Sequence, residues 1–456
     1  MPELPEVETV LRTLEGLIQG EKIADIDVYN EKITGDPEAF RASLTGQRFR
    51  RFLRRGKYLL FEMDDCTLMS HLRMEGKYYV YETKTPKAKH THVIFTFESG
   101  RQLHYNDVRQ FGRMEVLAKR EDYSDFHDLS PEPLSEEFNE SYLAEKLAQG
   151  KRPMKEVLLD QSVFAGVGNI YADEILFDAK IHPLTAQDRL NGNEIATIVS
   201  STKKILSKAT EAGGTTIRSY TSSLGVTGLF QLSLAVHEQK ACPLCGTEIR
   251  RIRVSGRSTY YCPSCQKQKR RIAITGTIGS GKSTVSKILR EKGYPVLDAD
   301  GINRALLEKG NEGYLLVREA FPECFEGEEL DKKKLSLLVF SDPKKRKQLE
   351  GLLHPLIMKT MIDGSKEYTL SFAEVPLLFE GHYEKLYDDS LLVVCTKKTA
   401  IERLRLRGLT KAESERRIKN QMPVSNKKKL AGKIIYNNGS LQDLEEEVEV
   451  WLEQLC

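Results

Sequence analysis

Four cysteines near the middle of the chain have the spacing of a metal site. Cys242, Cys245, Cys262 and Cys265 form the pattern C-x2-C-x16-C-x2-C. Four thiolates at such spacing bind zinc tetrahedrally, and a complete set of protein ligands leaves no position open for catalysis. In a reducing compartment, metal binding explains these cysteines better than disulfides do. The sequence therefore predicts one structural zinc.

A phosphate-binding loop follows after only ten intervening residues, in RRIAITGTIGSGKST. A short apolar strand precedes the motif GxxxxGKS and a helical stretch follows it, which is the context the motif requires. Its backbone N–H groups cradle phosphates, Lys282 neutralises charge on them, and the Ser283 hydroxyl holds Mg²⁺. The residues expected to bind ATP are Gly276, Thr277, Ile278, Gly279, Ser280, Gly281, Lys282, Ser283 and Thr284. The motif alone leaves a motor, a GTPase or a kinase open.

The N-terminal stretch MPELPEVETV offers a nucleophile. Removal of Met1 leaves Pro2 as a secondary amine, and an α-amino group titrates near pH 8, so part of it is unprotonated and nucleophilic. Attack on the anomeric carbon of a sugar gives an iminium, with Glu3 as proton donor and Glu6 as a second carboxylate. The stretch has neither the cationic start nor the apolar core of a signal peptide. A cytoplasmic protein is expected.

Several domains must position these groups, because 456 residues exceed what one hydrophobic core organises. Residues 1–130 alternate apolar and polar positions in short runs, which predicts a mostly β domain. Residues 131–240 show helical periodicity, and residues 241–268 hold the cysteines. From 271 to 456, apolar strands alternate with amphipathic helices, which is typical of a parallel sheet. No apolar run approaches the length of a membrane helix.

Charge is distributed unevenly along the chain. The net charge is +3, but residues 201–271 carry 13 Lys and Arg against 3 Asp and Glu, a difference of +10. Such a basic segment around the cysteines indicates a surface for a polyanion.

Two features beyond the phosphate-binding loop favour a small-molecule kinase. Asp298 and Asp300 in YPVLDAD end the second strand, which we expect beside the first. A carboxylate there can accept the proton of an attacking hydroxyl; the alternative is that Asp298 only caps the next helix. Arg403 and Arg407 lie four apart on a basic helical segment that suits a lid over phosphates, although a solvated helix has the same pattern.

The string PELPEVET resembles the N-terminus of formamidopyrimidine-DNA glycosylase, which removes 8-oxoguanine and ring-opened purines, and the resemblance extends to about residue 268. It implies a β-sandwich, a helix-two-turns-helix lobe and a zinc finger. It also implies glycosylase and AP lyase activity on damaged double-stranded DNA through a Schiff base on Pro2. The chain has DVRQFG where many members have DPRRFG, so Val108 and Gln110 are departures.

The same resemblance implies roles for further residues. Lys57 in RRGKYL takes part in catalysis and contacts the phosphate beside the lesion. Met74, Arg109 and Phe111 fill the gap left by the extruded nucleotide, a task that suits an apolar wedge and a guanidinium. The remaining residues expected at the DNA are Glu6, His90, Lys155, Asn169, Arg218 and Arg257. Arg218 begins a loop expected to cover the damaged base.

Residues 271–456 resemble dephospho-coenzyme A kinase, through GTIGSGKST, LDADGINRAL, LLHPLI, EVPLLFE and IIYNNG in this order. The resemblance implies ATP-dependent phosphorylation of the ribose 3′-hydroxyl of dephospho-CoA, with Lys282 and Asp300 catalytic and Asp300 as general base. It places Arg304 and His354 near the acceptor and makes Arg403 and Arg407 lid arginines. Ala431 and Gly432 stand where relatives often have Ala-Asp.

The sequence thus predicts a bifunctional enzyme that uses zinc, ATP and Mg²⁺, with no membrane partner. Two alternatives stay open from the residues alone. One is a zinc-finger DNA-binding protein driven by a phosphate-loop ATPase, and the other has one inactive half.

Overall fold

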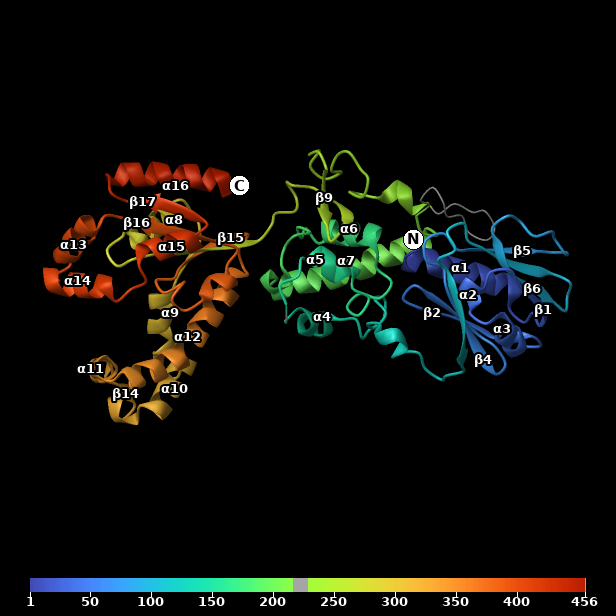
Figure 1. The fold of residues 1–456 in the computed structure, drawn as a ribbon, viewed down its shortest axis with the longest axis horizontal. Helices are drawn as coiled ribbons and strands as arrows, with labels where there is room; N and C mark the ends of the chain where they lie inside the picture. The colour runs from blue at the N-terminus through green and yellow to red at the C-terminus, as the bar shows by residue number, and fades with distance from the viewer. Residues whose placement is uncertain (149, 216–228, 456) are drawn as a thin grey trace. The chain divides into compact units, whose positions relative to one another are not determined.

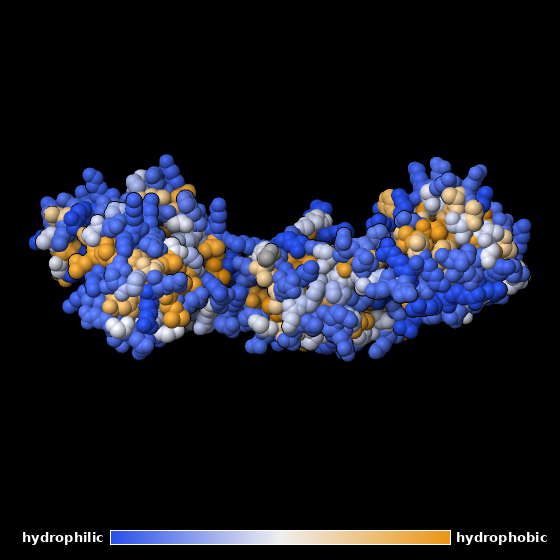
Figure 2. Space-filling model, turned by 90° about the horizontal axis from the view of Figure 1, so that it is seen from below, coloured by the Kyte–Doolittle hydropathy of each residue, from blue (hydrophilic) through white to orange (hydrophobic). Residues whose placement is uncertain are grey.

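The computed structural model describes residues 1–148, 150–215 and 229–455, and the chain divides into two compact units, Met1–Gln268 and Lys269–Cys456 (Figure 1). On the face drawn in Figure 2 most surface residues are hydrophilic, and apolar residues gather only in small groups. Among the described residues, no helix is both long enough and apolar enough to cross a membrane.

The N-terminal part of the first unit is a sandwich of two antiparallel four-stranded sheets, as expected. One sheet has the order β1-β6-β7-β5 and the other β2-β3-β4-β8. Their strands are β1 (Ile23–Val28), β2 (Arg51–Arg55), β3 (Tyr58–Glu62), β4 (Cys66–His71), β5 (Lys77–Tyr81), β6 (Thr91–Phe97), β7 (Gln102–Asn106) and β8 (Arg113–Ala118). Phe49 meets Phe61 and Phe97 edge-on in the core, with ring centroids 5.7 and 6.0 Å apart. The alternation in the sequence produced this sandwich because each strand buries one face in this core.

Helix α1 (Leu4–Ile18) carries the N-terminal residues onto this sandwich. Its buried residues recur every three or four positions and pack against the core of both sheets: Val7, Val10, Leu11, Leu14 and Ile18. The short helices α2 (Glu31–Thr34) and α3 (Pro37–Leu44) follow. The first turn of α1 is therefore fixed by the packing of the whole helix.

The second part of the first unit is helical, with α4 (Glu140–Leu147), α5 (Met154–Leu159), α6 (Asn169–Asp178) and α7 (Gly192–Glu211). Helix α6 is buried from Ile170 to Phe177, so it is the centre of this lobe. Helix α7 begins with a capping box, in which Asn191 Oδ1 accepts from Glu194 N at 2.9 Å and Glu194 Oε2 accepts from Asn191 N at 2.9 Å. The described part of the unit also contains the 3₁₀ turns η1 (Phe126–Asp128), η2 (Gln187–Arg189) and η3 (Phe230–Ser233).

The cysteine region forms an antiparallel ribbon of β9 (Arg250–Val254) and β10 (Arg257–Tyr261), with Val254 opposite Arg257. Ser255 and Gly256 make the two-residue turn, with φ of 46° and 76°. A tight hairpin requires positive φ at both positions, which explains the glycine.

The second unit is built on a five-stranded parallel sheet, as expected for a phosphate-loop kinase. The strand order is β12-β15-β11-β16-β17. Its strands are β11 (Arg270–Gly276), β12 (Val296–Asp298), β15 (Leu370–Glu374), β16 (Asp389–Val394) and β17 (Lys433–Tyr436). The expectation that the second strand lies beside the first is wrong, because β15 lies between β12 and β11.

Helices cover both faces of this sheet. Ile272 and Ile274 of β11 face α8 (Lys282–Glu291) and α16 (Leu441–Leu455), whereas Ala273 between them faces α12 (Pro343–Ser365). Helices α9 (Ala299–Leu306), α10 (Glu312–Ala320) and α11 (Lys332–Ser341) gather beside α12 (Figure 1). The remaining elements are η4 (Pro322–Cys324), β13 (Phe325–Glu326), β14 (Glu329–Leu330), η5 (Tyr383–Leu386), α13 (Lys397–Leu406), α14 (Lys411–Lys419) and α15 (Val424–Leu430).

Candidate active sites

Glu3 lies at the N-terminus of helix α6. Its carboxylate accepts hydrogen bonds from the backbone N–H groups of Gly168 at 2.7 Å, Ile170 at 3.0 Å and Tyr171 at 3.4 Å. A helix N-terminus stabilises a carboxylate through its free N–H groups and the helix dipole. A Cβ on Gly168 would come within 2.4 Å of Glu3 Cδ, so this approach requires glycine. Pro2, the residue before Glu3, is buried. The three hydrogen bonds hold the Glu3 carboxylate next to Pro2.

Glu6 lies one turn after Glu3 and is fully enclosed. It accepts from Glu3 N at 2.8 Å, Tyr171 Oη at 2.6 Å and Thr215 N at 2.7 Å. Burial raises the pKa of Glu6, and the nearby Glu3 charge acts in the same direction. These bonds fix the first turn of α1 against α6. The expected contact of Glu6 with DNA stays a prediction.

Lys57 enters the same site from the turn between β2 and β3. Its Nζ donates to Val167 O at 2.7 Å, in the turn that leads into α6, and its side chain is buried. Burial lowers the pKa of Lys57 to about 8, Glu3 opposes this shift, and the Arg257 guanidinium adds to it. The Glu3 carboxylate and the Lys57 ammonium therefore both bind the turn that leads into α6, next to Pro2.

The lowered pKa predicts a pH dependence of DNA binding. If protonated Lys57 contacts a phosphate, then above pH 8 binding must first return a proton to Lys57. We expect the Kd for a duplex with an abasic-site analogue to rise above pH 8, by at most about tenfold per pH unit. In Lys57→Arg the rise should disappear, because arginine does not titrate in this range. Fluorescence anisotropy between pH 7 and 9.5 measures it, and an equal rise in both proteins would contradict this role.

Two loops present the residues expected to replace the extruded nucleotide. Phe111 is exposed at 49%, and the Arg109 guanidinium lies 5.1 Å from its ring centroid. The Asp107 carboxylate holds their turn by accepting from Arg109 N at 3.0 Å and Gly112 N at 2.8 Å. Met74 and His90 are half-buried. An exposed phenylalanine next to an arginine fits a wedge between bases.

Lys155, which the sequence places near DNA, lies inside the protein in this structure, and its contact with DNA stays a prediction. Its side chain is fully buried, and Nζ donates to Asp173 Oδ1 at 2.6 Å and to Asn169 O at 2.8 Å. Asn169 lies at the start of α6, and its Nδ2 donates to Ser258 O of the cysteine ribbon at 2.9 Å. Lys155 therefore supports the Asn169 turn from inside the protein. Arg218 lies outside the described residues.

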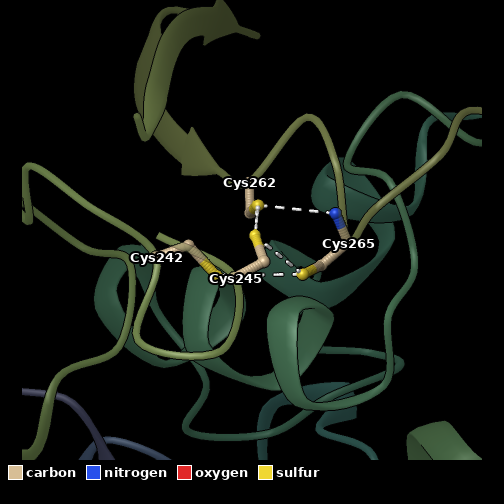
Figure 3. A group of neighbouring side chains, drawn as sticks. All are labelled: Cys242, Cys245, Cys262 and Cys265. Atoms are coloured by element: carbon tan, nitrogen blue, oxygen red, sulfur yellow. Dashed lines mark hydrogen bonds between the residues drawn. The ribbon is translucent and has the colours of Figure 1, made fainter. Parts of the chain in front are cut away.

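The four cysteines come together at the base of the ribbon (Figure 3). Their sulfur atoms all lie within 4.8 Å of one another, with Cys245 Sγ 3.5 Å from both Cys262 Sγ and Cys265 Sγ, and Cys242 Sγ 3.8 Å from Cys265 Sγ. Tetrahedral zinc with bonds of about 2.3 Å requires sulfur separations of about 3.8 Å. The geometry fits a structural zinc, whose four ligands join the two ends of the ribbon.

The phosphate-binding loop connects β11 to α8 in the second unit. Lys282 Nζ folds over this loop and donates to Gly276 O at 3.0 Å and Thr277 O at 3.1 Å. Burial lowers the pKa of Lys282 to about 8, while the charges of Glu374 and Asp300 act in the opposite direction. Ser283 is exposed in the first turn of α8, where a hydroxyl fits a Mg²⁺ ligand.

Arg403 reaches this loop from helix α13. Its guanidinium donates to Ser280 O at 3.2 Å and to Asn437 Oδ1 at 3.1 Å, and Asn437 Nδ2 donates to the same Ser280 carbonyl at 2.9 Å. A cavity of ≈ 390 Å³ lies beside them. Its lining includes Gly279, Gly281, Thr284, Arg403, Arg407 and Asn437. Loop glycines and two arginines around one cavity fit a nucleotide phosphate chain.

A second cavity of the kinase unit, ≈ 250 Å³, lies against α9 and α12. Asp300 and His354 both line it, and His354 Nδ1 lies 3.1 Å from Tyr383 Oη. Asp298 caps α9 by accepting from Asp300 N and Gly301 N, both at 3.1 Å. Arg304 lies one turn after Asp300 and is exposed, outside the lining of this cavity. The Asp298 carboxylate is thus occupied as the cap of α9, whereas Asp300 lines the cavity.

Sequence reasoning missed several residues that build these sites. Tyr171 and Thr215 hold Glu6, and Asn437 holds the phosphate-binding loop together with Arg403, which the sequence had predicted as a lid arginine. Gln421 Oε1 accepts from Ile278 N at 2.8 Å. The sequence offered a signal only for Asn437, in the string IIYNNG, because the other contacts join segments far apart in the chain.

The two units define a zinc-finger DNA glycosylase followed by a phosphate-loop kinase. Family models match in this order: "Formamidopyrimidine-DNA glycosylase N-terminal domain" at 1–114, "Formamidopyrimidine-DNA glycosylase H2TH domain" at 129–221, "Zinc finger found in FPG and IleRS" at 239–268 and "Dephospho-CoA kinase" at 270–443. The chain belongs to the formamidopyrimidine-DNA glycosylase family and carries a dephospho-CoA kinase domain after it.

Individual relatives agree with this assignment. The chain is 49% identical over 268 residues to a formamidopyrimidine-DNA glycosylase of Exiguobacterium sibiricum, covering 57% of this chain and 97% of the relative. It is 45% identical over 268 residues to that of Bacillus subtilis, again 57% and 97%. A Lactococcus lactis FPG mutant crystallised with Fapy-dG DNA is similar in structure, with a TM-score of 0.56, 42% identity, and coverage of 59% of this chain and 100% of that one.

Proposed function

We propose that one polypeptide excises oxidised purines from double-stranded DNA, cleaves the resulting abasic site, and separately phosphorylates dephospho-CoA with ATP. The glycosylase proposal rests on one observation: Glu3 and Lys57 converge, next to Pro2, on the turn from Val167 to Tyr171. The kinase proposal rests on Asp300, which lines a cavity with His354 and whose charge acts on Lys282 of the phosphate-binding loop. Four domains follow, at 1–130, 131–240, 241–268 and 271–456.

In the glycosylase step, the Pro2 nitrogen attacks C1′ of the damaged nucleotide after Met1 has been removed. The bond from C1′ to the base breaks, and the base leaves with the proton that the Pro2 nitrogen gives up. Protonated Glu3, fixed beside Pro2, then donates to the sugar ring oxygen; the bond from C1′ to that oxygen breaks and an iminium joins Pro2 to the opened sugar. The resulting Glu3 carboxylate accepts a C2′ proton as the 3′-phosphate leaves, and water hydrolyses the iminium to release Pro2. Lys57 and Arg257 bind the phosphates beside the lesion.

The other DNA contacts proposed are Met74, His90, Arg109, Phe111 and Asn169. Phe111 and Arg109 are the wedge, and their exposure supports this role. The zinc holds the ribbon that carries Arg257 and takes no part in the chemistry. The absence of a pairing pattern among the other cysteines, together with the zinc thiolates, supports a cytoplasmic location.

In the kinase step, the 3′-hydroxyl of dephospho-CoA attacks the γ-phosphorus of ATP and ADP leaves. Asp300 accepts the hydroxyl proton, and Lys282, Arg403 and Arg407 stabilise charge on the transferring phosphoryl group. Ser283 would hold Mg²⁺, which would supply positive charge to the phosphates. His354 and Arg304 bind the acceptor.

One protein sample tests both proposals. Borohydride should trap a covalent adduct with an 8-oxoguanine duplex, and mass spectrometry should locate the DNA on Pro2 of Met-processed protein. ATP consumption should depend on dephospho-CoA. Failure of any adduct to form with folded, processed protein would contradict the glycosylase. ATP hydrolysis stimulated by DNA, with no need for an acceptor, would support the ATPase motor instead.

A further inference from the structure

Two successive turns of helix α6 contact different parts of the protein, the first the active site and the second the segment before the zinc finger. Its first turn holds Glu3, as described above. Its second turn holds the segment that enters the finger, because the Glu174 carboxylate accepts from Ala235 N at 2.8 Å, Val236 N at 3.0 Å and His237 N at 2.9 Å. The backbone at 235–237 is thereby fixed to the helix that positions the catalytic carboxylate.

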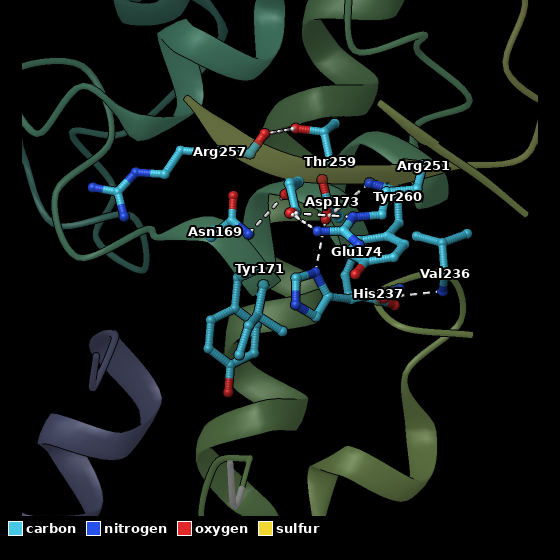
Figure 4. A network of polar contacts seen from close by, with 12 residues as sticks. Asn169, Tyr171, Asp173, Glu174, Val236, His237, Arg251, Arg257, Thr259 and Tyr260 are labelled. Carbon is cyan, nitrogen blue, oxygen red and sulfur yellow. Dashed lines mark hydrogen bonds and ion pairs between the residues drawn. The ribbon is translucent and has the colours of Figure 1, made fainter. Parts of the chain in front are cut away.

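Asp173, next to Glu174, joins three elements inside the protein (Figure 4). Its side chain is fully buried; Oδ1 accepts from Lys155, and Oδ2 accepts from His237 Nδ1 at 2.7 Å and from Tyr260 N at 3.2 Å. The His237 ring also meets the Tyr260 ring nearly edge-on, at 4.9 Å between centroids. His237, Asp173 and Tyr260 thus link the segment before the finger, α6 and strand β10.

This link sets where strand β10 lies along α6. Ser258 and Tyr260 are two residues apart, so their backbone groups point to the same edge of the strand. At that edge Tyr260 N meets Asp173 and Ser258 O meets Asn169 Nδ2 at 2.9 Å. Arg257, the residue before Ser258, is exposed, and its side chain extends away from the cluster (Figure 4). It lies close enough to Lys57 for its charge to act on that ammonium.

We propose that His237 is a positioning residue of the glycosylase: its Nδ1–H bond to Asp173, with its ring against Tyr260, fixes β10 so that Arg257 meets the DNA phosphate. This inference rests on the proposed glycosylase function. His237 itself contacts no DNA; its effect passes through Arg257. A histidine that only packs the finger would lower stability without acting on Arg257.

Two substitutions of His237 separate these roles. In His237→Asn the amide nitrogen occupies the place of Nδ1 and still donates to Asp173, whereas in His237→Gln it is displaced toward the place of Nε2. We expect His237→Gln to bind an abasic-analogue duplex roughly tenfold more weakly, with a slope of log K against log salt shallower by about 0.9, the value for one lost phosphate contact. Arg257→Ala should show the same change, and His237→Asn should resemble the unaltered protein.

A double substitution tests whether the effect passes through Arg257. His237→Gln added to Arg257→Ala should cause no further loss, because the contact is already gone. Additive losses would overturn the proposal, as would equal impairment of His237→Asn and His237→Gln. Loss of zinc or unfolding in His237→Gln, with zinc kept in His237→Asn, would assign His237 to finger stability and also overturn it.

Gln266 provides the matched control, as another buried attachment of the finger. Its Nε2 donates to Ile181 O at 2.8 Å, away from Arg257. Gln266→Ala should leave the salt slope unchanged; a shallower slope there would mean that any loosened finger displaces Arg257. The borohydride adduct of the unaltered protein separates the hypothesis that this chain is a glycosylase from the hypothesis that His237 positions Arg257. Its absence would refute the glycosylase, whereas its presence with an unchanged His237→Gln would refute only the role of His237.

Discussion

Glu3→Gln is expected to reduce excision of 8-oxoguanine by roughly 10³-fold, within the range for loss of a general acid. The carboxylate accepts from Gly168, Ile170 and Tyr171 at the start of α6. A glutamine has one carbonyl oxygen for these donors, and its NH₂ group would face backbone N–H groups. It also cannot deliver a proton to the sugar. Single-turnover excision kinetics with saturating enzyme measure the chemical step directly.

Glu62→Gln controls for the placement of a buried amide in the same domain. Glu62 is buried in β3 and pairs with Arg51 at 3.4 Å, in a different part of the sandwich from Glu3. We expect it to keep nearly full excision, and both variants to retain kinase turnover. Excision by Glu3→Gln within threefold of the unaltered protein would remove Glu3 from the mechanism.

The local motifs could be predicted from the sequence because their chemistry is carried by neighbouring residues. The cysteine pairs and the loop from Gly276 to Ser283 have fixed spacing, and the structure brings the four sulfurs together as expected. The alternation of strands and helices likewise predicted a parallel sheet. In each case, the residues that carry the sequence pattern are the same residues that form the predicted local structure.

Contacts between distant segments could not be predicted in this way. Lys155 reads as a DNA-binding lysine, yet Asp173, 18 residues later, pairs with it inside the protein. The predicted position of β12 beside β11 was also wrong, because β15 lies between these two strands. Strand order depends on where β15 inserts, and no local sequence pattern gives that position. Burial of Glu6 follows similarly from Thr215, 209 residues away. Charged residues are hydrophilic in sequence patterns whether or not a partner encloses them.

Lys282→Ala is expected to reduce dephospho-CoA phosphorylation on the order of 10³-fold. Lys282 is the cation at the centre of the phosphate-binding loop, and its Nζ lies within 3.1 Å of the carbonyls of Gly276 and Thr277. Because burial lowers its pKa to about 8, a nearby phosphate should restore the charge. Loss of this charge removes stabilisation from the transferring phosphoryl group. Coupled detection of ADP at saturating ATP and dephospho-CoA measures kcat.

Lys287→Ala is the matched control, since Lys287 lies on the same helix, α8, with a side chain exposed at 74% and an ion pair to Glu291 at 3.6 Å. Its removal should leave kcat within twofold, because a surface pair contributes little.

Lys282→Ala should keep the borohydride adduct with 8-oxoguanine DNA, just as Glu3→Gln should keep kinase turnover. Each unit has its own catalytic groups and its own hydrophobic cores, so each substitution should silence one activity alone. A Lys282→Ala protein that lost both activities while remaining folded would show that nucleotide binding controls the glycosylase.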